Sequence, residues 1–231
     1  MIQPNKLFNK RDYDDPHFSQ IKEWLEELYA NLQTDGLPFE YSDWNRAWEY
    51  AQLVHQTVPQ GKSVLDIGSG KSLFPILLAA REEAFVTSVD LEDVQDRYTL
   101  YIFGQEDIDV VKADAQDLPF KDSLFDIVYM ASVIEHVPDL SKALGQIFRV
   151  LKNGGTFAMT TDYTHDRSTI KSKKSGKTFE LSGIEELIES AKKAGFTLNG
   201  DLNVKEPALS NPDERAVKGE YTFISLIFKK L

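Results

Sequence analysis

The stretch Val64-Leu65-Asp66-Ile67-Gly68-Ser69-Gly70 combines an acidic residue with a glycine-rich turn, and both could contact a ligand. The apolar run at 64–67 predicts a strand, and the helix-like sequence after the turn predicts a helix. Glycine adopts positive φ angles without strain, and its missing Cβ lets a ligand approach main-chain N–H groups. Residues 68–70 are therefore a candidate binding turn.

Two further acidic residues follow predicted strands in the same way. Asp90 ends the next predicted strand. In nucleotide-binding sheets, an acid that follows the glycine-rich turn by roughly 20 residues accepts hydrogen bonds from the ribose hydroxyls, and Asp90 lies at about this separation from Asp66. Asp114, before Ala115, follows the third strand and could accept a hydrogen bond from the amino group of an adenine. Each acid alone could instead be a loop residue or a helix cap. Together they predict a site for an adenine nucleoside at one edge of a sheet.

Alternating strands and helices must position these residues. Apolar patterns predict strands at 64–67, 85–89, 108–112, 127–130 and 156–160, with helices at 73–81, 94–103, 140–151 and 184–194. This alternation predicts an α/β fold, a mostly parallel, doubly wound sheet with helices on both faces. The sequence Lys-Asn-Gly-Gly at 152–155 suits the end of the preceding helix. Strands at 196–202 and 221–228 have no helix between them, which predicts an antiparallel pair at the sheet edge.

The beginning of the chain predicts N-terminal helices. We expect residues 1–60 to form a helical cap before one domain of residues 61–231. Apolar residues recur at helical spacing over 18–32 and again after Ser42-Asp43, where either side chain could cap a second helix. The aromatic and basic residues of that second helix could line a substrate pocket or simply pack: Trp44, Arg46, Trp48 and Tyr50.

Composition excludes some functions. The 231 residues suit one α/β domain with an N-terminal addition. A net charge of −11 makes nucleic acid an unlikely partner, because binding a polyanion requires a cationic surface. The absence of cysteine excludes disulfides and thiolate metal ligands. No apolar run reaches membrane-span length and the polar start is unlike a signal peptide, so we expect a cytoplasmic protein without membrane contact.

One segment is locally basic. Residues 163–182 are predicted as a loop, whose charged residues between 167 and 177 are all basic: Arg167, Lys171, Lys173, Lys174 and Lys177. The loop is either a solvated surface or a contact for an anionic substrate.

Two classes of nucleoside ligand compete for the glycine-rich turn. A dinucleotide site uses a third glycine for close helix packing, and Leu73 occupies that place here. A nicotinamide-dependent oxidoreductase is therefore disfavoured.

The motifs resemble those of class I S-adenosylmethionine-dependent methyltransferases of the type 11 kind. Residues 64–70 look like the first motif of that family, and Asp90 and Asp114-Ala115 match its ribose and adenine motifs. The stretches at 125–139 and 148–155 are similar to its later motifs. The resemblance covers about residues 60 to 162. It implies a Rossmann-like, seven-stranded sheet whose last strand is antiparallel, with S-adenosylmethionine as cofactor.

The resemblance also implies which residues hold that cofactor. The glycine turn and the backbone near Ala131 would contact its methionine end. The implied cofactor-binding residues are Asp66, Gly68, Ser69, Gly70, Asp90, Leu91, Asp114, Ala115, Ala131 and Ser132.

Two residues are candidates for catalysis. A sulfonium methyl is already activated, so a base is needed only when the acceptor must lose a proton. His136 could be that base, because imidazole titrates near neutral pH and some small-molecule and sugar methyltransferases use a histidine in the corresponding motif. The alternative is that it caps or packs at a helix start. Asp162, after the fifth strand, could touch the acceptor or only shape the strand end.

A metal-assisted reaction is the less favoured variant. Ubiquinone-pathway and small-RNA 2′-O-methyltransferases carry Glu-x-x-Glu-His and bind a divalent ion with it. Here Ser132 stands in place of the first acid, before Glu135-His136, and one lost oxygen ligand weakens such a site. We therefore expect no metal. In the metal-dependent alternative, His165 would be the extra ligand.

The function expected from these observations is methyl transfer to a small-molecule or glycan-like acceptor, most simply to an oxygen. The glycan follows from a resemblance of 160–165 and 221–226 to methyltransferases of bacterial surface-glycan gene groups. Because the acceptor side is less clearly marked than the cofactor side, a catalytically silent S-adenosylmethionine-binding partner or sensor stays open. The acceptor itself and the oligomeric state do not follow from the sequence.

Overall fold

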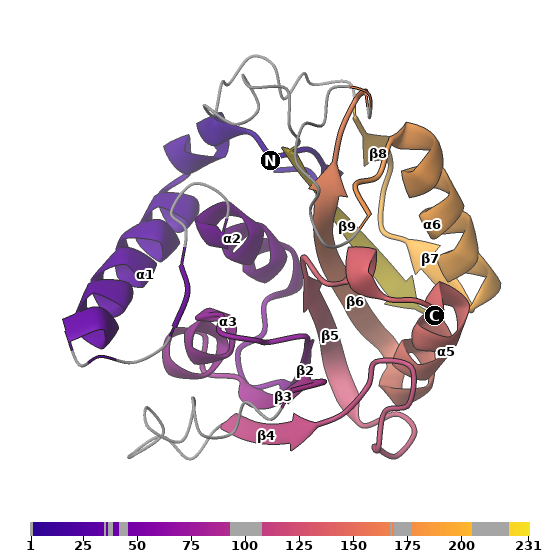
Figure 1. Cartoon of the computed structure of the whole chain (residues 1–231), viewed down its shortest axis with the longest axis horizontal. Coiled ribbons are helices and arrows are strands. Elements are labelled where there is room, and N and C mark those ends of the chain that lie inside the picture. The colour runs from indigo at the N-terminus through magenta and orange to yellow at the C-terminus, as the bar shows by residue number, and fades with distance from the viewer. Residues whose placement is uncertain are drawn as a thin grey trace.

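A seven-stranded sheet in the order β4-β3-β2-β5-β6-β9-β7 forms the centre of the computed structural model (Figure 1). The structure describes residues 2–34, 36, 39–41, 46–92, 108–166, 168, 177–204 and 222–231. The strands are β2 (Ser63–Ile67), β3 (Phe85–Asp90), β4 (Ile108–Lys112), β5 (Phe125–Ala131), β6 (Leu151–Tyr163), β7 (Phe196–Leu198) and β9 (Thr222–Lys230). Only β9 runs antiparallel to its neighbours among these strands. The predicted doubly wound sheet with an antiparallel last strand is confirmed.

Helices cover both faces of this sheet (Figure 1). One face carries α1 (Pro16–Thr34), α2 (Arg46–Thr57) and α3 (Phe74–Ile76), and the other carries α5 (Leu140–Val150) and α6 (Leu181–Lys193). Short helical turns are η1 (Lys10–Asp14), η2 (Leu77–Arg81) and η3 (Ile134–His136). Successive strand residues point to opposite faces of the sheet. Val64 therefore packs in the apolar core under α1, α2 and α3, and Leu65 packs in the core under α5 and α6. None of the described helices is long and apolar enough to cross a membrane.

Most predicted helices are confirmed. The helices expected at 18–32, 140–151 and 184–194 correspond to α1, α5 and α6. The helix expected at 73–81 begins at Phe74 and widens after Ile76 into the π-helical turn η2. The helix expected at 94–103 and the cap candidates Ser42 and Asp43 lie outside the described residues.

The segment at 152–155 was predicted wrongly as a helix end. The helix α5 stops at Val150, and Leu151 is already extended and pairs with Phe125. A Cβ on Gly155 would lie 2.8 Å from the carbonyl oxygen of Lys152 and 3.0 Å from that of Asp126. This glycine therefore serves a close backbone approach within the sheet.

The C-terminal strands also differ from the prediction in detail. The expected strand at 196–202 breaks after β7, where Gly200 has a φ of +84°. Its end becomes β8 (Leu202–Asn203), which pairs in parallel with β1 (Asn5–Lys6), a strand that the sequence pattern does not reveal. The antiparallel pairing of the last two main strands is confirmed, but β9 lies between β6 and β7, so β7 forms the edge.

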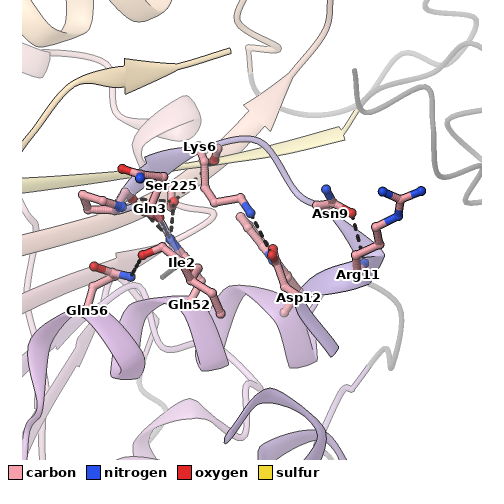
Figure 2. A network of polar contacts seen from close by, with 11 residues as sticks. Ile2, Gln3, Lys6, Asn9, Arg11, Asp12, Gln52, Gln56 and Ser225 are labelled. Carbon is pink, nitrogen blue, oxygen red and sulfur yellow. Dashed lines mark hydrogen bonds and ion pairs between the residues drawn. The ribbon is translucent and has the colours of Figure 1, made fainter. Parts of the chain in front are cut away.

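Buried polar contacts tie the N-terminal segment to α2 and β9 (Figure 2). The Gln52 side chain donates to the carbonyl oxygen of Gln3 at 2.8 Å and to the Ser225 hydroxyl at 3.0 Å. Lys6 forms a buried ion pair of 2.8 Å with Asp12. These contacts hold α2 against the sheet, and the division into a cap of 1–60 and a domain of 61–231 stays a prediction.

Candidate active site

A pocket of about 350 Å³ opens at the carboxyl ends of β2, β3, β4 and β5. The strand order reverses beside β2, which lies between β3 and β5, and ligands in doubly wound sheets bind at such a switch point. Many of the residues predicted from the sequence line this pocket: Gly68, Asp90, Leu91, Asp114, Ala115, Ser132 and His136. Others do not line it: Asp66, Ser69, Gly70, Ala131 and Asp162.

The glycine turn is fastened to the end of β3. The Gly68 N–H donates to the carbonyl oxygen of Val89 at 2.7 Å, and the Gly70 N–H donates to Oδ2 of Asp90 at 2.9 Å. Gly68 has a φ of +78°, and a Cβ there would lie 2.5 Å from Cγ2 of Val133. Only glycine therefore fits at position 68 without displacing Val133, which also lines the pocket.

Asp66 is buried beneath this turn. Its side-chain Oδ2 has no hydrogen-bond partner among the described residues. Burial, followed by the nearby negative charge of Asp90, raises the pKa of Asp66 to about 8. A buried polar atom without a partner is costly, so a cationic or donor group from a ligand would complement it.

Asp90 and Asp114 reach the same pocket by different local turns. Oδ1 of Asp90 accepts from the Glu92 N–H at 3.0 Å, while its Oδ2 holds the glycine turn. Asp114 accepts from the Gln116 N–H at 2.8 Å, and the backbone and side-chain hydrogen bonds of Gln116 lower its pKa. Asp114 thus fills the loop-stabilising role that the sequence left open while also lining the pocket.

A buried polar cluster adjoins the pocket at the ends of β5 and β6. Oε1 of Glu49, on α2, accepts hydrogen bonds from the hydroxyls of Ser132 and Thr160. Its Oε2 accepts from Arg46 at 3.0 Å. The sequence patterns did not single out Glu49 or Thr160. The available signal was a glutamate on the apolar face of an amphipathic helix, between Trp48 and Tyr50.

The two predicted catalytic residues lie in different surroundings. His136 ends η3, is exposed and lines the pocket. Asp162 is buried on β6, where its charge acts on Glu135 and Arg46, and it does not line the pocket. Burial, followed by the charge of Asp162, raises the pKa of Glu135 to about 8. Glu135 accepts from the Thr161 hydroxyl at 3.0 Å.

The residues suggested for acceptor binding lie in different surroundings, and some of them lie outside the described residues. Trp48 and Tyr50 are core residues, and the Tyr50 ring stacks on Phe74 with 4.7 Å between centroids, so packing explains them. Arg46 is partly exposed and belongs to the polar cluster around Glu49. Trp44 and residues 167 and 169–176 of the basic loop lie outside the described residues. Of its basic residues, Lys177 is described, and its N–H donates to the carbonyl oxygen of Glu135 at 3.0 Å.

Comparison with known proteins agrees with this geometry. Residues 65–159 match the family described as Methyltransferase domain. The ubiquinone/menaquinone biosynthesis C-methyltransferase UbiE of Bartonella bacilliformis is 36% identical over 121 residues, which cover 49% of this chain and 46% of that protein. The sterol 24-C-methyltransferase ERG6A of Gibberella zeae is 31% identical over 166 residues, covering 62% and 44%. The chain spans about half the length of these curated relatives or less.

A solved structure shows the same fold. The [4+2]-cyclase SpnF superposes with a TM-score of 0.62 and 19% identity, covering 83% of this chain and 86% of that one. The sheet, the pocket and the domain match together show that residues 65–159 belong to a class I S-adenosylmethionine-dependent methyltransferase domain. The cofactor of this class is S-adenosylmethionine, and the resemblance seen in the sequence is confirmed.

Proposed function

We propose that this chain transfers the methyl group of S-adenosylmethionine to a small organic acceptor. The observation that carries the proposal is that Asp90, Asp114 and the Gly68 turn, from three different strand ends, line one pocket at the switch point of the sheet. The pocket volume of about 350 Å³ is within the range of small-molecule sites, roughly 300–1,000 Å³.

The residues present fit this cofactor. We expect the free lone pairs of Asp90 to accept the ribose hydroxyls, while Asp114 and Ala115 meet the adenine. The open face of Gly68 leaves room for the part of the cofactor that joins ribose to methionine. The buried Oδ2 of Asp66, which lacks a partner among the described residues, suits the cationic amino group of the methionine end.

The bound cofactor would supply an activated methyl on a sulfonium. The chain would then align an acceptor and exclude water. Alignment of this kind supplies several kcal/mol of the roughly 7–11 kcal/mol by which proximity and orientation lower a reaction barrier. We propose His136 as the group that accepts the acceptor proton, and its exposure and its place in the lining of the pocket support this role. We propose Asp162 as a residue that orders the acceptor side together with Glu135 and Arg46.

We infer an oxygen of a small-molecule or glycan-like compound as the acceptor atom. An exposed imidazole suits removal of a hydroxyl proton near neutral pH. Carbon is the competing atom, since the curated relatives are named C-methyltransferases. Nuclear magnetic resonance of the product made with a labelled methyl group distinguishes the two, and a new carbon–carbon bond would overturn the oxygen assignment.

The test of the function is turnover of S-adenosylmethionine with a panel of hydroxylated small molecules and sugars. We expect His136→Ala to lower kcat by about 10²-fold or more while the Kd for S-adenosylhomocysteine stays within about twofold of the wild type. A loss of affinity together with stability would show that His136 packs rather than acts as a base.

A second candidate is a catalytically silent binding protein that acts as a partner or sensor. Its support is that the acceptor side is less clearly marked than the cofactor side, since Asp162 is buried and does not line the pocket. The fold alone does not fix the reaction, because a chain of this fold is named as a cyclase. Tight cofactor binding without turnover of any acceptor would favour this candidate.

A further inference from the structure

Glu49 carries a carboxylate that is fully buried and fully engaged. Its Oε1 accepts from the Thr160 hydroxyl at 2.7 Å and from the Ser132 hydroxyl, and its Oε2 accepts from Nη1 of Arg46 at 3.0 Å. Arg46 precedes it by one helical turn of α2 and compensates its charge. Charge-assisted hydrogen bonds, such as the one from Arg46 to Glu49, are about twice as strong as neutral ones.

Ser132, which Glu49 holds, has an unusual backbone conformation. Its φ is +55°, a left-handed value that costs a residue with a Cβ roughly 1–2 kcal/mol. The residue follows the end of β5 directly and lines the cofactor pocket. Its N–H donates to the carbonyl oxygen of Thr160 at 3.1 Å and to the Thr160 hydroxyl at 3.2 Å. The conformation therefore depends on partners from β6 and α2.

We propose that Glu49 is a positioning residue, which holds Ser132 and Thr160 so that the turn after β5 keeps the shape needed to receive the cofactor. The inference rests on the proposed binding of S-adenosylmethionine in this pocket. Glu49 lies outside the matched residues 65–159 and comes from the N-terminal helices. It gives those helices a role in the cofactor site as well as in the core.

Gln52 offers a matched control on the same helix. Like Glu49 it is fully buried and polar, but it donates to Gln3 and Ser225, which lie at the N-terminal segment and β9 (Figure 2). Neither of these partners lines the pocket. Changing Gln52 therefore loosens α2 without touching the turn that contains Ser132.

The experiment measures the Kd for S-adenosylhomocysteine by calorimetry, together with unfolding in urea. Glu49→Gln keeps the side-chain volume but offers one acceptor oxygen instead of two, so either Arg46 or the hydroxyl pair loses its partner. We expect about tenfold weaker binding. Ser132→Ala should weaken binding similarly. The Kd of the double variant should not exceed the larger of the two single-variant Kd values, because both changes remove the same contact.

Two further readouts separate positioning from general destabilisation. Gln52→Ala should lower the urea midpoint and leave the Kd within about twofold of the wild type. In turnover, Glu49→Gln should raise the KM for S-adenosylmethionine more than it lowers kcat, since it acts on the binding turn.

Each alternative result has a definite meaning. A wild-type protein that binds no S-adenosylhomocysteine contradicts the proposed function itself. If the wild type binds, the positioning role is refuted by a folded Glu49→Gln with unchanged Kd, by strictly additive effects with Ser132→Ala, or by an equal loss in Gln52→Ala. Should Glu49→Gln fail to fold, Thr160→Val replaces it, because that variant removes the neighbouring hydroxyl at nearly constant volume, and the same comparisons apply.

Discussion

Asp66 and Glu135 are both buried carboxyl groups, and their surroundings differ in a way that matters for function. Glu135 has the Thr161 hydroxyl as a donor, whereas Oδ2 of Asp66 has no partner within the described part of the chain. Burial is the main cause that raises each pKa to about 8. Before the cofactor binds, Asp66 is therefore expected to be protonated, because no cationic group of the described residues is paired with it.

The raised pKa of Asp66 makes stability depend on pH. The folded pKa of about 8 exceeds the ordinary value of 3.8, so the folded state binds a proton that the unfolded state has released between these values. Its contribution to stability is complete below about pH 4 and is lost as the pH rises to about 8. Without cofactor, the urea midpoint of the wild type should therefore fall across this range more steeply than that of Asp66→Asn. Parallel pH profiles for the two proteins would contradict the assignment.

At the scale of elements, the site is made where strands end and change direction. Each of β2, β3, β4 and β5 ends beside the pocket, and the turns after them carry its polar groups. The turn after β2 is the most constrained, because Gly68 combines a positive φ with a close approach to Val133. Backbone conformation at strand ends, more than side-chain chemistry alone, shapes the space for the ligand.

Gly68→Ala tests this constraint against a matched glycine. Alanine at position 68 has the left-handed conformational cost and would also place its Cβ 2.5 Å from Cγ2 of Val133, a pocket residue that must then shift. Gly61 has a similar φ of +68° with nothing within 4 Å of a Cβ, so Gly61→Ala has only the conformational cost of roughly 1–2 kcal/mol. In calorimetry, Gly68→Ala should bind S-adenosylhomocysteine more than about tenfold more weakly, while Gly61→Ala binds normally. Equal affinities would show that the Gly68 turn does not shape the site.

The elements also show which features a sequence can predict. The alternation of strands and helices and the acids at successive strand ends follow local patterns, so the sheet and the pocket residues Asp90 and Asp114 were predictable. Glu49 was not, because its partners Ser132 and Thr160 are distant in the chain and only the fold brings them together.

At the scale of the whole molecule, the N-terminal residues belong to the same core as the sheet. Helices α1 and α2 pack with β2 and β5 in one apolar cluster. The two-residue pairing of β1 with β8 was not predictable, since it joins segments from nearly opposite ends of the chain. The place of β9 between β6 and β7 was not predictable either, because β9 pairs with β6, which is not the preceding strand in the sequence. Gln52 ties α2 to the N-terminal segment and to Ser225 of β9, and this positions Glu49 of the same helix beside Thr160 of β6.

The whole sheet serves to bring acids from separate strand ends to one cofactor, and calorimetry with Asp90→Ala tests this most directly. The wild type should bind S-adenosylmethionine and S-adenosylhomocysteine with micromolar Kd, and Asp90→Ala should bind both about tenfold or more weakly, since it loses the ribose contact and the bond to Gly70. Asp122→Ala, at an exposed acid paired with Arg149 and absent from the pocket lining, is the control and should bind normally. A wild type without affinity for either compound, or an Asp90→Ala variant that binds as tightly as the wild type, would contradict the account.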